Sequence, residues 1–118
     1  MVTDLIEIDP EAPATAAIER AAEAVRRGRV VAIPTDALYA LVADPFSLHA
    51  MGLVFRAKGR EIHRSLPLLV SGVEMAESLA RELTERFYKL AGAFWPGPLT
   101  VIVPASAKVP LKVTGNTG

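Results

Sequence analysis

The sequence contains no cysteine and only two histidines, His49 and His63, among its 118 residues. The lack of thiols excludes disulfide bonds and thiolate metal sites, and it fits the reducing cytoplasm, where we expect this protein to reside. The two imidazoles are far apart in the sequence, whereas a structural zinc site takes its four ligands mainly from cysteine and histidine. We therefore expect no metal site built by the protein itself.

Neither sign of charge is in excess, because 13 basic residues balance 13 acidic ones. A neutral protein has no long-range field that attracts nucleic acid, so a site for a polyanion has to be a local cluster. Long hydrophobic runs are also absent, since none approaches the roughly 18 apolar residues that cross a bilayer. Residues 1–9 alternate apolar and acidic side chains, unlike a signal peptide. We expect a soluble protein without membrane contact.

The composition is that of a globular protein, with 51% hydrophobic and 22% charged residues. The length fits one domain, so we take residues 1–118 as a single domain. The spacing of apolar residues and the glycine and proline breaks predict helices at residues 14–27, 47–57, 75–83 and 87–94. Short apolar or β-branched runs predict strands at residues 5–8, 29–33, 66–71 and 99–103.

These strands alternate with helices, and the central ones are apolar on both faces. The sequence therefore predicts an α+β (mixed α/β) domain in which helices cover a sheet. Residues 115–118, Gly-Asn-Thr-Gly, are typical of a turn that leads into another strand. We accordingly expect the domain to be incomplete at the C-terminus.

The strongest local charge lies at residues 56–64, where four basic residues stand against one acidic residue. Lys58 and Arg60 flank Gly59 and are two positions apart, which places them on the same side of an extended loop. Lysine supplies a compact charge and arginine a planar fork, and the combination suits a polyphosphate. The residues alone equally allow a solvated basic helix end that favours the helix dipole.

A second candidate follows the predicted strand at residues 29–33. Thr35 offers a hydroxyl and Asp36 a carboxylate at the end of that strand, where ligands bind in sheets of this kind. The residues alone favour a plain turn in which Asp36 caps the next segment. No pattern predicts a nucleophile–base pair or a glycine-rich nucleotide loop, so we assign no catalytic residue.

Together these segments resemble one family. Residues 34–41 read Pro-Thr-Asp-x-x-Tyr-x-Leu, residues 58–60 read Lys-x-Arg, residues 66–68 read Leu-Pro-Leu, and residues 94–100 read Phe-Trp-Pro-Gly-Pro-Leu-Thr. In this order and spacing they are similar to the YrdC-like domain of threonylcarbamoyl-AMP synthases, and the similarity covers nearly the whole chain.

The resemblance implies a twisted mixed sheet flanked by helices, of which residues 1–118 form the N-terminal portion. It implies three substrates, ATP, L-threonine and bicarbonate, with Mg²⁺ carried by the ATP. The implied products are pyrophosphate and threonylcarbamoyl-AMP, and the latter feeds tRNA modification. It also implies tRNA or double-stranded RNA as a partner, and the sequence leaves a homodimer open. We expect Lys58, Arg60, Arg64 and Thr117 to bind the nucleotide, and Thr35 to bind the substrate.

The sequence departs from the family pattern at several positions. Ala37 replaces a threonine that helps to hold the substrate amino acid, Ala40 replaces a glycine, and Glu61 replaces a proline beside the phosphate site. The family's later Arg-x-Pro and Ser-x-Asn elements are not found in residues 1–118. Two alternatives therefore stay open: a non-catalytic nucleotide- or double-stranded-RNA-binding relative, and a carbamoyl-transfer domain, which would be accompanied by further domains.

Overall fold

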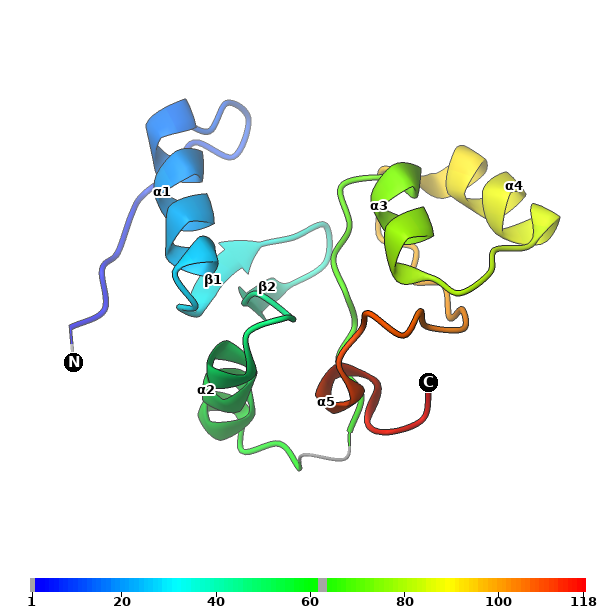
Figure 1. Cartoon of the computed structure of the whole chain (residues 1–118). Coiled ribbons are helices and arrows are strands. Elements are labelled where there is room, and N and C mark those ends of the chain that lie inside the picture. The colour runs from blue at the N-terminus through cyan, green and yellow to red at the C-terminus, as the bar shows by residue number, and fades with distance from the viewer. Residues whose placement is uncertain (1, 62–63) are drawn as a thin grey trace.

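A computed structural model describes residues 2–61 and 64–118. It confirms the mixed α/β class, with one small sheet and five helices in this described part of the chain (Figure 1). In chain order the elements are α1 (Thr15–Arg26), β1 (Val31–Pro34), β2 (Tyr39–Val42), α2 (Leu48–Lys58), α3 (Val73–Leu79), α4 (Glu85–Phe94) and α5 (Leu111–Thr114). A membrane-spanning helix is not found among these residues.

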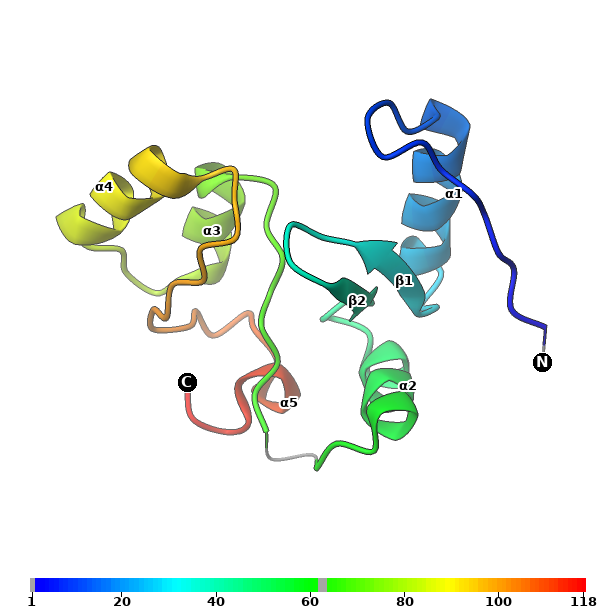
Figure 2. The same ribbon diagram turned by 180° about the vertical axis from the view of Figure 1, so that it is seen from behind.

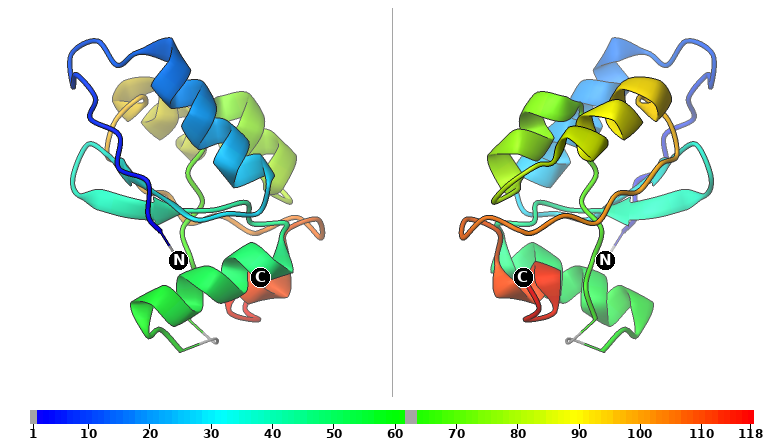
Figure 3. Two further views of the ribbon diagram at one scale, coloured as in Figure 1. Left: turned by 90° about the vertical axis from the view of Figure 1, so that its left-hand side faces the viewer. Right: turned by 90° about the vertical axis from the view of Figure 1, so that its right-hand side faces the viewer.

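The sheet is an antiparallel hairpin of β1 and β2, in register from Val31 opposite Val42 to Pro34 opposite Tyr39. Helices α1, α3 and α4 lie on one side of the hairpin, and α2 and α5 lie on the other (Figure 3). The extended segment at residues 64–72 runs between the α1–β1–β2–α2 half and the α3–α4 half (Figures 1 and 2). The predicted flanking of a sheet by helices is thus present around a sheet of two strands.

Local sequence explains where the helices begin and end. The side chain of Ser47 accepts a 3.2 Å hydrogen bond from the N–H of Ala50 at the start of α2, and Thr84 does the same for Phe87 at the start of α4. Helix α1 ends at Arg26, and Gly28 follows in a left-handed conformation with φ 74°, close to the end that the sequence predicts.

Two hydrophobic clusters hold the chain together. The first joins Met51 and Val54 of α2 to Val109 and to Val113 of α5, and the second joins Ala76 of α3 to α4. In the second cluster Phe87 is 3% exposed, and its ring meets the Trp95 ring edge to face with 5.6 Å between the centroids. The aromatic residue that follows α4 therefore packs against the buried face of that helix.

The strands predicted at residues 5–8, 66–71 and 99–103 are not strands in the structure. A β-strand is defined by a hydrogen-bonded neighbour, and none of these segments has one among the described residues. Residues 66–70 and 99–103 nevertheless keep the alternation of half-buried and exposed side chains that a strand shows.

Candidate functional site

The end of α2 sets the geometry of the predicted basic loop. Gly59 adopts a left-handed conformation, with φ 58° and ψ 30°, that favours glycine. Its N–H donates to the carbonyl of Arg56 at 3.2 Å, and the N–H of Arg60 donates to the carbonyl of Phe55 at 3.0 Å. This pair of bonds is a Schellman motif, which stops the helix and turns the chain sharply between Lys58 and Arg60.

Arg64 is the third basic residue of the predicted cluster, and two backbone hydrogen bonds position it. The N–H of Arg64 donates to the carbonyl of Glu61 at 3.1 Å. Two residues later, the N–H of Leu66 donates to the carbonyl of Val113 in α5 at 2.8 Å. Because Val113 is buried in the same cluster as α2, this bond ties the Arg64 segment to the helix that carries Lys58.

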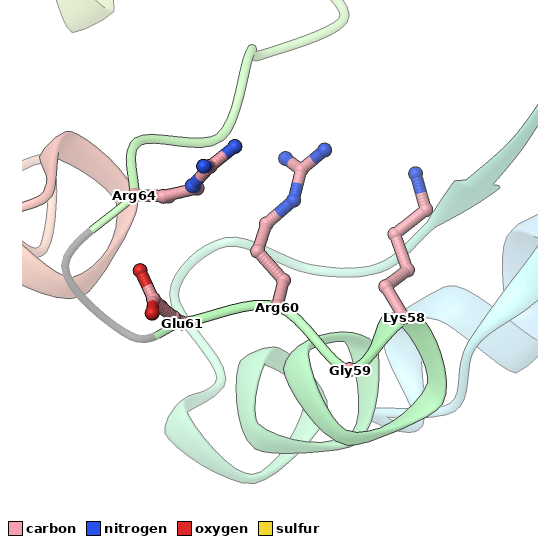
Figure 4. A pocket seen from close by; sticks show the side chains of 5 residues that line it. All are labelled: Lys58, Gly59, Arg60, Glu61 and Arg64. Atoms are coloured by element: carbon pink, nitrogen blue, oxygen red, sulfur yellow. The ribbon is translucent and has the colours of Figure 1, made fainter.

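These residues surround one open hollow of about 340 Å³, lined by Lys58, Gly59, Arg60, Glu61 and Arg64. Lys58 and Arg60 extend side by side, and Arg64 reaches toward Arg60 across the hollow (Figure 4). Lys58 is also exposed in the last turn of α2, where a cation favours the helix dipole, so the interpretation of the loop as a solvated basic helix end stays open.

The three cations of the hollow form no ion pair among the described residues. The basic end of α1 is different, because Arg26 and Arg27 both bond Glu23, at 3.1 and 2.8 Å. Their hydrogen bonds and charges hold the pKa of Glu23 below its usual range. Like charges in the hollow repel one another, and a bound polyanion would neutralise them. The charge of the hollow therefore suits phosphate groups, whose binding stays a prediction, whereas the arginines at the end of α1 are already paired with Glu23.

No group of three or more acidic or histidine side chains that could hold a metal occurs in residues 2–61 and 64–118. Glu61 supplies one carboxylate at the hollow. Magnesium commonly uses one or two carboxylates together with substrate phosphates, so this residue set fits a metal that arrives with a nucleotide.

Thr35 lies outside this hollow, in the loop between β1 and β2. Its hydroxyl accepts hydrogen bonds from the N–H groups of Ala37 at 3.3 Å and Leu38 at 3.2 Å, and donates to the carbonyl of Leu38. The plain-turn interpretation assigned the capping role to Asp36. In the structure it is the Thr35 hydroxyl that holds the turn. Substrate binding by Thr35 stays a prediction.

Thr117 lies beyond α5 and does not line the hollow. Its hydroxyl donates a 2.7 Å hydrogen bond to the carbonyl of Thr114, and its side chain is exposed. Its contact with a nucleotide also stays a prediction. Sequence reasoning missed Lys112, whose ammonium nitrogen lies 5.9 Å from the centre of the Phe55 ring and so packs α5 on α2.

Comparison with known proteins explains the architecture. The Sua5/YciO/YrdC family model, which is described as telomere recombination, matches residues 23–118. The chain belongs to this family. The resemblance of its motifs to the YrdC-like domain is thereby confirmed.

Among its relatives in the family, a threonylcarbamoyl-AMP synthase from Pyrococcus abyssi is 41% identical over 99 residues, which is 84% of this chain and 29% of the relative. A threonylcarbamoyl-AMP synthase from Saccharophagus degradans is 34% identical over 90 residues, 76% of this chain and 47% of the relative. The crystal structure of P. abyssi Sua5 complexed with L-threonine superposes with a TM-score of 0.84 and 38% identity, over 88% of this chain and 31% of that one. The family member described here thus spans about a third to a half of these relatives.

Proposed function

We propose that this chain carries the nucleotide-binding part of a threonylcarbamoyl-AMP synthase, which forms threonylcarbamoyl-AMP and pyrophosphate from ATP, L-threonine and bicarbonate. The observation that carries the proposal is the hollow at the end of α2, where Lys58, Arg60 and Arg64 meet without an ion pair among the described residues. The similarity to proteins named threonylcarbamoyl-AMP synthase supports the reaction, and the relative solved with L-threonine supports the amino acid.

The chemistry matches what these side chains can do. The amine of L-threonine takes up the carbon of bicarbonate with loss of water, and a carboxylate oxygen of the resulting carbamate attacks the α-phosphorus of ATP. The bond from the α-phosphorus to the bridging oxygen breaks, and pyrophosphate leaves. Such a step needs positioned positive charge on the triphosphate more than a protein nucleophile. Lys58, Arg60 and Arg64 would supply that charge, with Mg²⁺ bound mainly by the phosphates.

The remaining parts of the proposal follow from the family. Thr117 would contact the nucleotide and Thr35 the substrate, the product would serve tRNA modification in the cytoplasm, and tRNA or double-stranded RNA would be a partner. A homodimer is part of the same proposal.

A second candidate is a nucleotide- or RNA-binding relative without catalysis. Ala37 favours it, since its methyl group stands where the family has a hydroxyl for the substrate. The hydroxyl of the neighbouring Thr35 cannot replace that group without giving up its bonds to the loop.

Release of pyrophosphate tests the two candidates. Purified chain is incubated with ATP and Mg²⁺, with and without L-threonine and bicarbonate. We expect release that needs both co-substrates and is lost in the Lys58→Ala/Arg60→Ala variant. Binding of ATP without any release of pyrophosphate would favour the second candidate, and the absence of both would contradict the proposed function.

A further inference from the structure

The hollow at the end of α2 contains an acidic side chain among its basic ones. Its described lining consists of Lys58, Gly59, Arg60, Glu61 and Arg64, so three positive charges stand against one negative charge, a net charge of +2. A carboxylate in a site for phosphates opposes their binding, because like charges repel one another. The presence of Glu61 therefore restricts which polyanions the hollow can accept.

Two observations place the Glu61 carboxylate within the site. The carbonyl of Glu61 accepts the 3.1 Å hydrogen bond from the N–H of Arg64, which holds the two residues together in the loop. The side chains of Glu61 and Arg64 lie on the same side of that loop, next to Arg60 (Figure 4). Glu61 is also exposed, so a hydrated ligand can reach its carboxylate.

A magnesium ion is the ligand that reconciles this carboxylate with a triphosphate. Mg²⁺ prefers oxygen ligands, keeps several of its waters, and is commonly bound through one or two carboxylates together with the phosphates of a substrate. It also cancels about two negative charges of the triphosphate. The metal-bound form of ATP thus matches a lining with a net charge of +2 better than the metal-free form does.

We infer that Glu61 is a metal-contacting residue that makes the hollow selective for magnesium-bound ATP over metal-free ATP. The inference rests on the proposed function and adds to it the form of ATP that the site accepts. Lys58, Arg60 and Arg64 attract the phosphates of either form, whereas Glu61 attracts the metal and repels a triphosphate without it. A purely cationic hollow would have the opposite preference, since metal-free ATP carries the larger negative charge.

Titration calorimetry at constant ionic strength tests the inference through binding alone. The wild type and Glu61→Gln, which keeps the shape of the side chain and removes its charge, are titrated with ATP in excess Mg²⁺ and with ATP in EDTA. We expect the wild type to bind the magnesium form at least about tenfold more tightly. In Glu61→Gln the magnesium form should bind more weakly and the metal-free form more tightly, with a ratio of the two Kd values within about twofold. A loss of structure would weaken both forms.

Two further variants make the test specific. Glu61→Asp keeps the negative charge at the hollow and should retain a preference for the magnesium form. Glu82→Gln removes an exposed carboxylate from the loop between α3 and α4, away from the hollow, and should keep both affinities of the wild type.

Three results would overturn the inference. One is a wild type that binds metal-free ATP as tightly as the magnesium form. Another is an unchanged preference in Glu61→Gln, which would assign the metal to the phosphates alone and leave the proposed function standing. The third is a wild type that binds neither form of ATP, and this result would contradict the proposed function as well.

Discussion

The N–H of Arg60 donates a 3.0 Å hydrogen bond to the carbonyl oxygen of Phe55, across the left-handed turn at Gly59. This bond fixes where the guanidinium of Arg60 leaves the helix relative to Lys58, so the cationic hollow depends on a backbone conformation as well as on charge. Phe55 is 4% exposed, and the ammonium group of Lys112 lies near its ring. The turn is therefore anchored in the packed part of the molecule.

Gly59→Ala should lower the free energy of unfolding by about 1 kcal/mol, because the Cβ of alanine makes a positive φ unfavourable. No atom lies within 4 Å of the added methyl group, so conformation and not a clash would be the cause. Gly92→Ala is the matched control: its added methyl is equally unhindered, but this glycine lies inside α4, where alanine should stabilise by up to about 1 kcal/mol. Urea unfolding measures both, and a stabilising Gly59→Ala would contradict the assigned turn.

Thr35→Val should loosen the loop between β1 and β2, because it keeps the shape of the side chain and removes the hydroxyl that accepts from Ala37 and Leu38. We expect a loss of about 0.5–1 kcal/mol and faster hydrogen exchange at those two amides. Thr35→Ser should behave as the wild type. Equal exchange in all three proteins would show that the hydroxyl does not organise the loop.

Phe87→Ala should be strongly destabilising, by about 3–5 kcal/mol, since the ring is buried against Trp95. Phe94→Ala removes the same atoms from a side chain of α4 that is 58% exposed, and should cost less than about 1 kcal/mol. The two midpoints of urea unfolding would be compared, and similar losses would contradict the position of the second cluster.

Helices α1 to α4 could be predicted from the sequence because their signals are local, whereas the four-residue helix α5 was not predicted. The predicted helix at residues 14–27 is α1, and the left-handed Gly28 lies just beyond its end. The position of Lys58 and Arg60 around the end of α2 could be predicted for the same reason, since the charges and the glycine are adjacent in the sequence.

Interactions between distant parts of the chain could not be predicted in this way. The bond from Leu66 to Val113, which brings Arg64 to the hollow, joins residues far apart in the sequence, and so does the contact of Lys112 with Phe55. The predicted strands at residues 66–71 and 99–103 have the right side-chain alternation. A strand also needs a neighbour, however, and no local pattern reveals whether the described chain provides one.

The central claim is that the hollow at the end of α2 binds the phosphates of ATP. Titration calorimetry with ATP and Mg²⁺ would compare the wild type with Lys58→Ala/Arg60→Ala and with Arg26→Ala/Arg27→Ala, which removes two cations from the end of α1. We expect the first variant to lose about 3 kcal/mol of binding free energy, roughly a 100-fold weaker Kd, and the second to bind as the wild type. An unchanged affinity in the first variant, or an equal loss in both, would contradict the claim.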